Sequence, residues 1–250
     1  NGGWTQQALV AVSVSTAFDL WRAVAVTYAS SYLRTGPDGM PCGYRFDLLD
    51  AAGKPRALLA GEQAAWWSDG SGIPPSNGVG ILDAKANGKD PAYAGLAARN
   101  WDCYEAILTC LRALWQAQTA EAKTLQRSVQ QTRTKLPQSG VPVLVIHGLS
   151  DGLVPAAFTS APYVRFAQSK RSSLRYWQVE NAQHFDAFLG QPVLAAQYVP
   201  MMPYAYRGLD AMWAHIAQGA PLPTDRVFRT VPRKVSGTGL DPLSAANLDF

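Results

Sequence analysis

The sequence predicts an α/β fold with a mostly parallel β-sheet, and two features of the chain indicate it. In the second half, short apolar segments alternate with segments of helical periodicity, an order typical of parallel strands joined by crossover helices. Residues 141–147, VPVLVIH, are almost entirely apolar, as expected of a strand that is buried on both faces. With 250 residues, the chain is long enough for one such domain carrying an insertion.

The composition is that of a globular protein and gives no sign of a nucleic-acid partner. Hydrophobic residues make up 48% of the chain and charged residues 16%, which are proportions of a folded domain. The net charge is +4, but the Lys and Arg residues are scattered and form no block that would bind nucleic acid. No run of 18 apolar residues occurs, so no membrane-spanning helix is predicted. Because the chain begins with Asn, the absence of a leader sequence carries no conclusion.

The three cysteines are Cys42, Cys103 and Cys110. They contain no CxxC pair, which argues against a structural zinc site. Cys103 and Cys110 are seven residues apart on a predicted helix, about 10 Å along its axis and too far to bond each other. Cys42 would bond one of them in an exported chain, and three buried thiols are the alternative. Nothing in the sequence points to a metal or an organic cofactor.

Residues 1–29 are assigned to the core. Asn1-Gly2-Gly3 precedes a predicted helix at 4–14, and glycines before a helix permit a tight turn. Residues 20–29, LWRAVAVTYA, form a compact apolar stretch with β-branched residues. They are therefore predicted to be the next buried strand.

Residues 30–140 read as an insertion that forms a mainly helical cap. Gly, Pro and Asp punctuate its first part. An apolar stripe at 104–115 then predicts a helix, and the polar segment 120–135 predicts a solvated one. Trp66 and Trp67 would either line a substrate cleft or pack within the cap.

Residues 141–219 return to the core, and residues 220–250, which contain four prolines, are predicted to be an extended C-terminal tail. The core elements expected in order are a strand at 141–147, a loop at 148–155, a helix at 156–169, a strand at 174–180 and an amphipathic helix at 201–218.

Two polar residues follow the two core strands. Asp151 lies in the loop after the strand at 141–147, and His184 lies in the loop after the next strand. The carboxyl ends of parallel strands share one edge of the sheet, where open α/β sheets place their sites. A carboxylate that accepts a hydrogen bond from one imidazole nitrogen leaves the other nitrogen able to take a proton from a serine. We therefore predict that Asp151 orients His184 as a general base.

The serine partner is harder to assign. Gly148 to Gly152 matches G-x-S-x-G, but Pro155 follows and the predicted helix begins later, whereas a nucleophile elbow passes directly into its helix. Ser150 is therefore rejected. Asn1-Gly2-Gly3 before a helix looks like the second half of an S-N-G-G elbow, so we expect the serine immediately before Asn1. The backbone N–H of Asn1 would then donate to the oxyanion hole.

The remaining polar candidates have structural interpretations. Asp186 is expected to be a local cap or surface residue, His147 to pack at the end of its strand, and His215 to occupy an ordinary helical position.

Several segments resemble the bacterial 3-hydroxybutyrate oligomer hydrolases. They are the opening Asn-Gly-Gly, the loop at 148–155, NAQHFD at 181–186 and LDAMW at 209–213. The resemblance covers the last 110 residues and the first 30. It implies a secreted or periplasmic serine esterase of the α/β-hydrolase fold whose N-terminal strands are absent from this chain, with Asp151 as the acid and His184 as the histidine. A missing N-terminal part of the same protein would complete the sheet.

The function predicted is hydrolysis of short 3-hydroxybutyrate oligomers through an acyl-enzyme. Two alternatives stay open. One is another capped esterase, acting on polyesters or aromatic esters, because specificity resides in the cap. The other is a binding module of the same fold that lacks a nucleophile.

Overall fold

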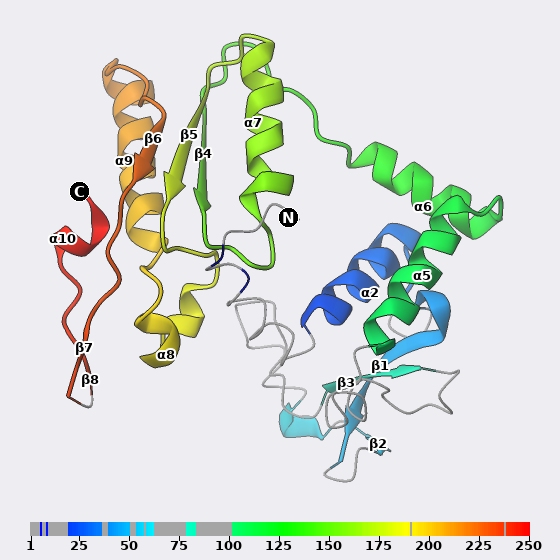
Figure 1. Ribbon diagram of the computed structural model, residues 1–250. Helices are drawn as coiled ribbons and strands as arrows, with labels where there is room; N and C mark the ends of the chain where they lie inside the picture. Colours follow the sequence, from blue (N-terminus) through cyan, green and yellow to red (C-terminus); the bar gives the residue numbers. More distant parts are fainter. Residues whose placement is uncertain are drawn as a thin grey trace. The chain divides into compact units, whose positions relative to one another are not determined.

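The computed structural model describes Gln6, Leu9 and residues 20–36, 40–50, 54–57, 59–62, 79–83, 102–190, 192–237 and 239–250. The chain divides into two compact units, each with its own sheet (Figure 1). The core unit comprises residues 1–16 and 134–250, and the second unit comprises residues 17–133.

The core unit contains a three-stranded parallel sheet. Its strands are β4 (Val143–Gly148), β5 (Leu174–Val179) and β6 (Arg226–Phe228), in the order β4-β5-β6. Val143 pairs with Leu174 and Gly148 with Val179 in one parallel register. The two strands predicted from their apolar runs are therefore confirmed. The third lies in the segment predicted to be an extended tail, where only three residues pair with β5.

Helices cover both faces of this sheet (Figure 1). α7 (Ser160–Ser169) packs Val164 and Ala167 against Leu174 and Tyr176 of β5. On the opposite face, α9 (Met202–Gln218) packs Tyr204 against Trp177 and Val179. Successive side chains of a strand point to opposite faces, so the mixed apolar sequence of β5 supplies both layers. The result is the mixed helix-and-sheet arrangement that the sequence predicts.

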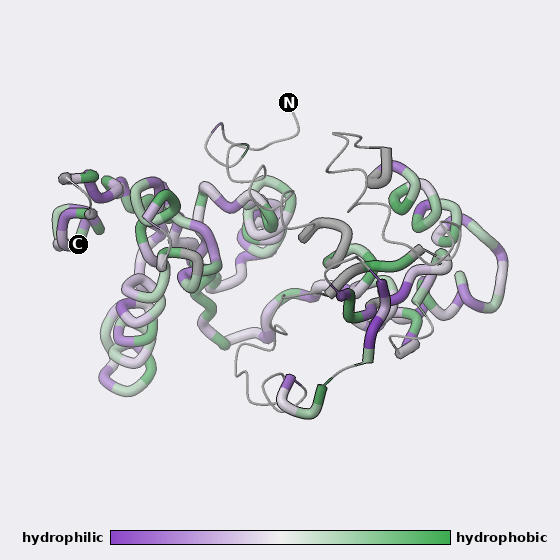
Figure 2. Tube along the Cα trace, turned by 90° about the horizontal axis from the view of Figure 1, so that it is seen from below, coloured by the Kyte–Doolittle hydropathy of each residue, from purple (hydrophilic) through white to green (hydrophobic). Residues whose placement is uncertain are grey.

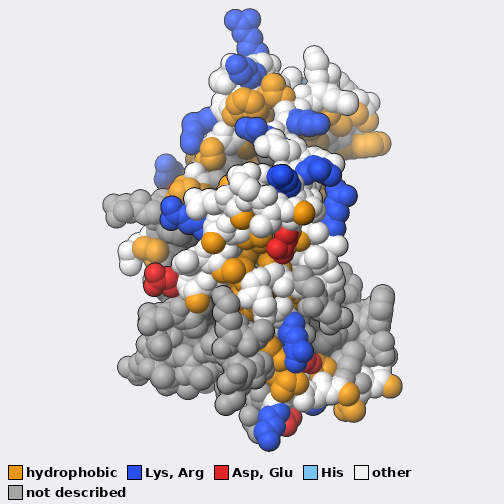
Figure 3. Space-filling view, turned by 90° about the vertical axis from the view of Figure 1, so that its right-hand side faces the viewer, with side chains coloured by type: hydrophobic (Ala, Val, Ile, Leu, Met, Phe, Trp, Pro, Cys, Tyr) orange, Lys and Arg blue, Asp and Glu red, His pale blue; other side chains and the backbone are white. Residues whose placement is uncertain are grey.

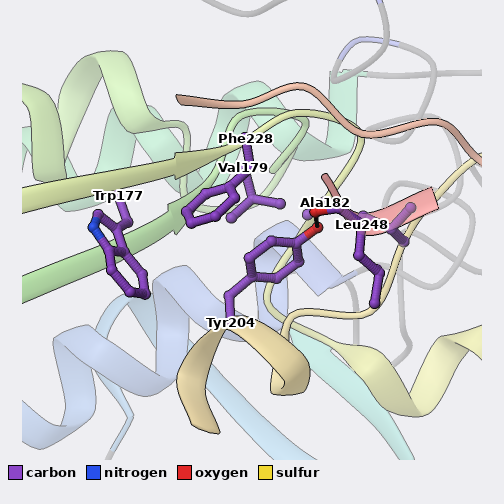
Figure 4. Packing of buried hydrophobic residues seen from close by; sticks show 7 residues of the cluster. Trp177, Val179, Ala182, Tyr204, Phe228 and Leu248 are labelled. Atoms are coloured by element: carbon purple, nitrogen blue, oxygen red, sulfur yellow. Dashed lines mark hydrogen bonds between the residues drawn. The ribbon is translucent and has the colours of Figure 1, made fainter. Parts of the chain in front are cut away.

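The α9 face is closed by an aromatic cluster (Figure 4). The Phe228 ring packs edge-on against Trp177 at a centroid distance of 5.3 Å and against Tyr204 at 4.9 Å. The Tyr204 side chain is fully buried, and its hydroxyl donates a hydrogen bond to the Leu248 carbonyl at 2.8 Å. A buried phenol needs such a partner. The last residues of the chain thus belong to the core.

The helix predicted at 201–218 is confirmed as α9, and Gly219 ends it with φ of 72°. The side of the helix that packs on the sheet carries Tyr204 and Gly208. Leu209, Trp213 and Ile216 contribute to the amphipathic pattern from which this helix is predicted, but each is 66% exposed and does not pack on the sheet. In Figure 2, hydrophobic residues recur from turn to turn along the helices.

The second unit begins with α2 (Leu20–Leu33), so the strand predicted at 20–29 is wrong. Val26, Ala29, Ser30 and Leu33 are buried, and their spacing of three and four residues is that of one helical face. A short apolar run does not distinguish a strand from a buried helix. Here the segment extends to 14 residues, a length typical of helices.

The rest of the second unit joins two helices to an antiparallel sheet. α5 (Asp102–Gln116) and α6 (Ala120–Gln131) match the helices predicted at 104–115 and 120–135. Thr119 caps α6 by accepting a hydrogen bond from the Ala122 N–H. The sheet was not predicted. Its strands are β1 (Tyr44–Leu49), β2 (Pro55–Arg56) and β3 (Val79–Asp83), in the order β2-β1-β3.

A disulfide joins Cys42 to Cys110 with a Cα–Cα distance of 6.1 Å. It connects η2 (Pro41–Gly43) to α5, and both lie beside a core of Val26, Tyr44 and Ile107. Of the two pairings left open by the sequence, the structure contains the one with Cys110.

Shorter elements complete the described chain. They are η4 (Ala156–Phe158), η5 (Asp186–Gly190), α8 (Pro192–Ala195), β7 (Val235–Ser236), β8 (Gly239–Leu240) and α10 (Ala245–Leu248).

Among the described residues, no helix combines the length and the hydropathy needed to cross a bilayer. On the face drawn in Figure 3, Lys and Arg side chains are spread among neutral ones.

The predictions made for Asn1, Trp66 and Trp67 fall outside the described residues. Within the helix predicted at 4–14, the described residues are Gln6 and Leu9, and both are helical.

Candidate active site

The loop after β4 is fastened to the loop after β5 through the backbone. The Leu149 N–H donates to the Val179 carbonyl at 2.8 Å, and the Ser150 N–H donates to the Ala182 carbonyl at 3.0 Å. Gly148 makes this approach possible, since a β-carbon there would collide with the Ala182 carbonyl and lie 2.8 Å from the Gln183 nitrogen. The two loops predicted to converge therefore lie in direct contact.

Asp151 stands at the centre of this junction and is 3% exposed. One carboxylate oxygen, Oδ1, accepts hydrogen bonds from the N–H groups of Leu153 at 3.0 Å and Val154 at 2.7 Å. The other, Oδ2, lies 2.5 Å from Nδ1 of His184. Burial alone would raise the pKa of Asp151, but the hydrogen bonds from His184 and the Val154 N–H outweigh it, so the pKa lies below its ordinary value. The carboxyl is therefore ionised at neutral pH.

Nδ1 of His184 faces the Asp151 carboxylate, and Nε2 lies at the opposite edge of the ring. Its side chain is 38% exposed, and its ring centroid is 4.0 Å from that of Phe185. When Nδ1 donates its proton to the carboxylate, a neutral imidazole keeps Nε2 as an acceptor. The pair thus has the geometry of a general base held in one tautomer.

Gln183 holds the histidine loop from the preceding position. Its side-chain oxygen accepts a hydrogen bond from the Phe185 N–H, and its side-chain nitrogen donates to the Phe185 carbonyl, both at 2.7 Å. These two bonds bracket His184 and fix the path of the backbone through it. No role was predicted for Gln183, although its position next to the histidine was a usable signal.

The turn before the histidine is fastened to the C-terminal segment. Asn181 has φ of 52°, a left-handed conformation that Asn tolerates. Its side-chain nitrogen donates to the Thr230 carbonyl at 2.8 Å, and the Thr230 hydroxyl donates to the Glu180 carbonyl. Residues predicted to form a tail therefore brace the site.

Asp186 caps the start of a helix 15 residues further along the chain, whereas the sequence predicts a local cap or a surface residue. Its two oxygens accept hydrogen bonds from the N–H groups of Met201 at 2.8 Å and Met202 at 2.9 Å, at the start of α9. A carboxylate there satisfies free backbone donors and complements the helix dipole. The cap also ties the histidine loop to α9.

The other two histidines bond backbone carbonyls. Nε2 of His147 lies 2.8 Å from the Val154 carbonyl oxygen, so this ring fastens the loop that carries the acid. Nδ1 of His215 lies 2.7 Å from the Ala220 carbonyl, just past the end of α9. His147 thus helps to position Asp151, and His215 completes a helix terminus.

Tyr198 forms part of the surroundings of Asp151. It is 3% exposed, and its hydroxyl has no hydrogen-bond partner among the residues that the structure describes. Burial and the negative charge of Asp151 both raise its pKa. The phenol therefore stays neutral and places no second negative charge beside Asp151.

Ser150 lies immediately before the acid and is 2% exposed. After it the chain runs through Asp151 to Pro155 before η4 begins at Ala156. This path lacks the immediate entry into a helix that a nucleophile elbow requires. Within the described part of the chain, no group of three or more His, Cys, Asp or Glu side chains could hold a metal ion.

Fold and site together define an α/β protein in which a buried aspartate contacts a partly exposed histidine at the carboxyl edge of a parallel sheet. The sequence matches the 3HB-oligomer hydrolase (3HBOH) family over residues 1–249, and the chain belongs to this family. No solved structure matches it.

Curated relatives carry the same description. The chain is 36% identical over 255 residues to a D-(-)-3-hydroxybutyrate oligomer hydrolase of Azoarcus sp. (strain BH72), a match that covers 98% of this chain and 36% of the relative. It is 34% identical over 257 residues to the protein of that name from Paracidovorax citrulli, with the same coverage of each. For the Cupriavidus necator protein of that name the identity is 34%, over 93% of this chain and 34% of the relative. The chain thus spans about a third of the length of these relatives.

Proposed function

We propose that this chain carries the acid and the histidine of a serine esterase that hydrolyses short 3-hydroxybutyrate oligomers. The observation that supports it most is the contact between Nδ1 of His184 and Oδ2 of Asp151, in a chain that belongs to the 3HB-oligomer hydrolase family. The relatives are named for hydrolysis of such oligomers. An oligomer of this kind is a linear ester, and acyl transfer to serine suits its hydrolysis.

The proposed chemistry follows from the pair. Nε2 of His184 removes the proton of the serine hydroxyl as that oxygen attacks the ester carbonyl. The Asp151 carboxylate stabilises the imidazolium that forms. The imidazolium then gives its proton to the oxygen of the leaving alcohol, and an acyl-serine remains. Water, deprotonated by His184, attacks the acyl group, and the returning proton restores the serine and releases the acid.

The nucleophile and the oxyanion hole belong to the start of the chain. We place the serine immediately before Asn1, with the Asn1 N–H as one donor to the oxyanion. The N-terminal part of the same protein would supply the remaining strands of an α/β-hydrolase sheet. In this proposal residues 30–140 form the cap that the sequence predicts. The Cys42–Cys110 disulfide supports a secreted or periplasmic location, since such bonds persist in oxidising compartments.

The test uses the full-length protein with 3-hydroxybutyrate dimer and trimer as substrates. His184→Ala should lower kcat by at least about 1,000-fold, because the general base is lost. It should also abolish covalent labelling by a fluorophosphonate probe. Asp151→Asn should lower kcat by a similar factor while the protein stays folded. His215→Ala is the matched control, because it also removes an imidazole that makes a hydrogen bond through Nδ1, here to the Ala220 carbonyl, and lies outside the pair.

The outcomes separate the alternatives. Turnover and labelling that survive in His184→Ala would exclude the proposed base. Rapid turnover of p-nitrophenyl or polyester substrates without turnover of the dimer and trimer would indicate another esterase. An intact full-length protein that neither turns over esters nor reacts with the probe would indicate a binding module.

A further inference from the structure

The outer edge of β4 has no strand beside it among the described residues. The parallel sheet has the order β4-β5-β6, so β5 is the neighbour of β4 on one side. On the other side, the strand predicted at 20–29 would have been expected to pair, but that segment is the helix α2 of the second unit.

The sequence of β4 is that of an interior strand. β4 reads VLVIHG and β5 reads LRYWQV, yet the more polar strand is the better buried. Leu174, Tyr176, Trp177 and Val179 are buried in β5, whereas every residue of β4 before Gly148 is only partly buried. Natural edge strands are protected by charged side chains, prolines or bulges. β4 contains no charged residue or proline, which indicates that another strand covers it.

The two faces of β4 already have partners, so its missing contact is at the edge. Val143 and Val145 pack beneath α7 with Val164, and Leu144 and Ile146 pack with the cluster beneath α9. A helix or an apolar side chain would therefore find the faces occupied. In the described part of the chain, no strand pairs with the backbone groups at the outer edge of β4, and a further β-strand would supply partners for them.

The register identifies these backbone groups. Because the Leu149 N–H donates to Val179 of β5, and N–H groups alternate in direction along a strand, the N–H groups of Val145 and His147 also face β5. The N–H groups of Leu144 and Ile146 therefore point to the outer edge.

We propose that a β-strand from the part of the family's polypeptide that this chain does not span pairs in parallel with the outer edge of β4 through the backbone of Leu144 and Ile146. The matches cover 36% of the Azoarcus relative, so most of that relative's length is available to supply the strand. A strand on the same polypeptide has a high effective concentration. This inference deepens the proposed completion of the sheet and is independent of the chemistry assigned to Asp151 and His184.

Residue-resolved amide hydrogen exchange tests the proposal in the full-length protein and in the 250-residue chain. In the full-length protein, Leu144 and Ile146 should exchange as slowly as Val145 and His147. In the 250-residue chain, Leu144 and Ile146 should exchange more than about tenfold faster than Val145, because only the β5 side is bonded. Val145 and His147 serve as internal controls on the same strand.

Three results would overturn the proposal. Fast exchange of Leu144 and Ile146 beside protected Val145 in the full-length protein would show an open edge. Slow exchange at all four positions in a dilute, monomeric 250-residue chain would show that the chain covers its own edge. Slow exchange that depends on concentration and accompanies a dimer would assign the edge to a second copy. Fast exchange of Leu144 and Ile146 in the full-length protein overturns the proposal even if the 250-residue chain does not fold alone, and ester turnover does not enter the measurement.

Discussion

The α-carbon of Gly148 lies so close to the carbonyl of Ala182 that no side chain fits between them. This contact joins the end of β4, which leads to Asp151, to the turn that precedes His184. The separation between acid and imidazole is thus set by backbone packing rather than by the reach of long side chains.

Gly148→Ala is expected to destabilise the protein by more than about 2 kcal/mol, because the obstacle is backbone that cannot rotate away. The free energy of unfolding, measured by urea titration, checks this. Gly190→Ala is the control, since a β-carbon there would meet no atom within 4 Å. Equal unfolding free energies for the two variants would mean that the loops are not packed as described.

Asp151 should make the stability of the protein depend on pH in the acid range. Its pKa is lower in the folded chain than its ordinary value, so its ionised form stabilises the fold above about pH 4. This contribution should be lost as the pH falls below that value through the folded pKa. The difference in unfolding free energy between the wild type and Asp151→Asn should therefore shrink between pH 5 and pH 2. A difference that grew on acidification would have the wrong sign.

Asp186→Ala should loosen the start of α9. The change removes two charge-assisted hydrogen bonds to the Met201 and Met202 N–H groups, at a cost of about 1–3 kcal/mol in unfolding free energy. Asp210→Ala, an exposed position on the same helix, should change stability by less than about 0.5 kcal/mol. Thermal unfolding followed by circular dichroism compares them, and equal effects would argue against the cap.

The Cys42–Cys110 disulfide should stabilise the second unit. It closes a loop across a sequence separation of 68, and bonds of this kind contribute roughly 2–4 kcal/mol by restricting the unfolded chain. The double variant Cys42→Ser, Cys110→Ser should unfold at correspondingly lower denaturant concentration. A reducing agent should have that effect on the wild type and no further effect on the double variant. Insensitivity of the wild type to reduction would count against a stabilising bond.

The sequence was sufficient to predict the elements that carry strong periodicity. The strand before Asp151 follows from its short apolar run and α5 from its apolar stripe. The strand before His184, α6 and α9 also lie where a strand, a solvated helix and an amphipathic helix were predicted. The convergence of Asp151 and His184 followed from a general property of parallel sheets, that consecutive strand ends share an edge. Their hydrogen bond is present in the structure, and their catalytic role stays a prediction.

The predictions of secondary structure and of residue roles failed where the local sequence pattern and the tertiary contacts favour different outcomes. Residues 20–29 contain Val and Thr in an apolar run, which suits either a strand or a buried helix. β6 has only three residues, so its pairing arises from the sheet beside it rather than from its own pattern. Gln183 bonds the backbone of its own loop and Thr230 bonds the backbone of a distant turn, and neither kind of contact leaves a periodic signal. Asp is common at helix starts, but the helix that Asp186 caps begins 15 residues further on, a separation that local sequence does not reveal.

The brace formed by Thr230 has a consequence for the order in which the protein assembles. During synthesis, the strand before His184 leaves the ribosome about 50 residues ahead of Thr230. Until Thr230 emerges, the turn at Asn181 lacks the hydrogen bonds that hold its left-handed backbone. The acid–imidazole pair is therefore expected to mature among the last features of the nascent chain, which would keep an incomplete polypeptide from acquiring a finished site.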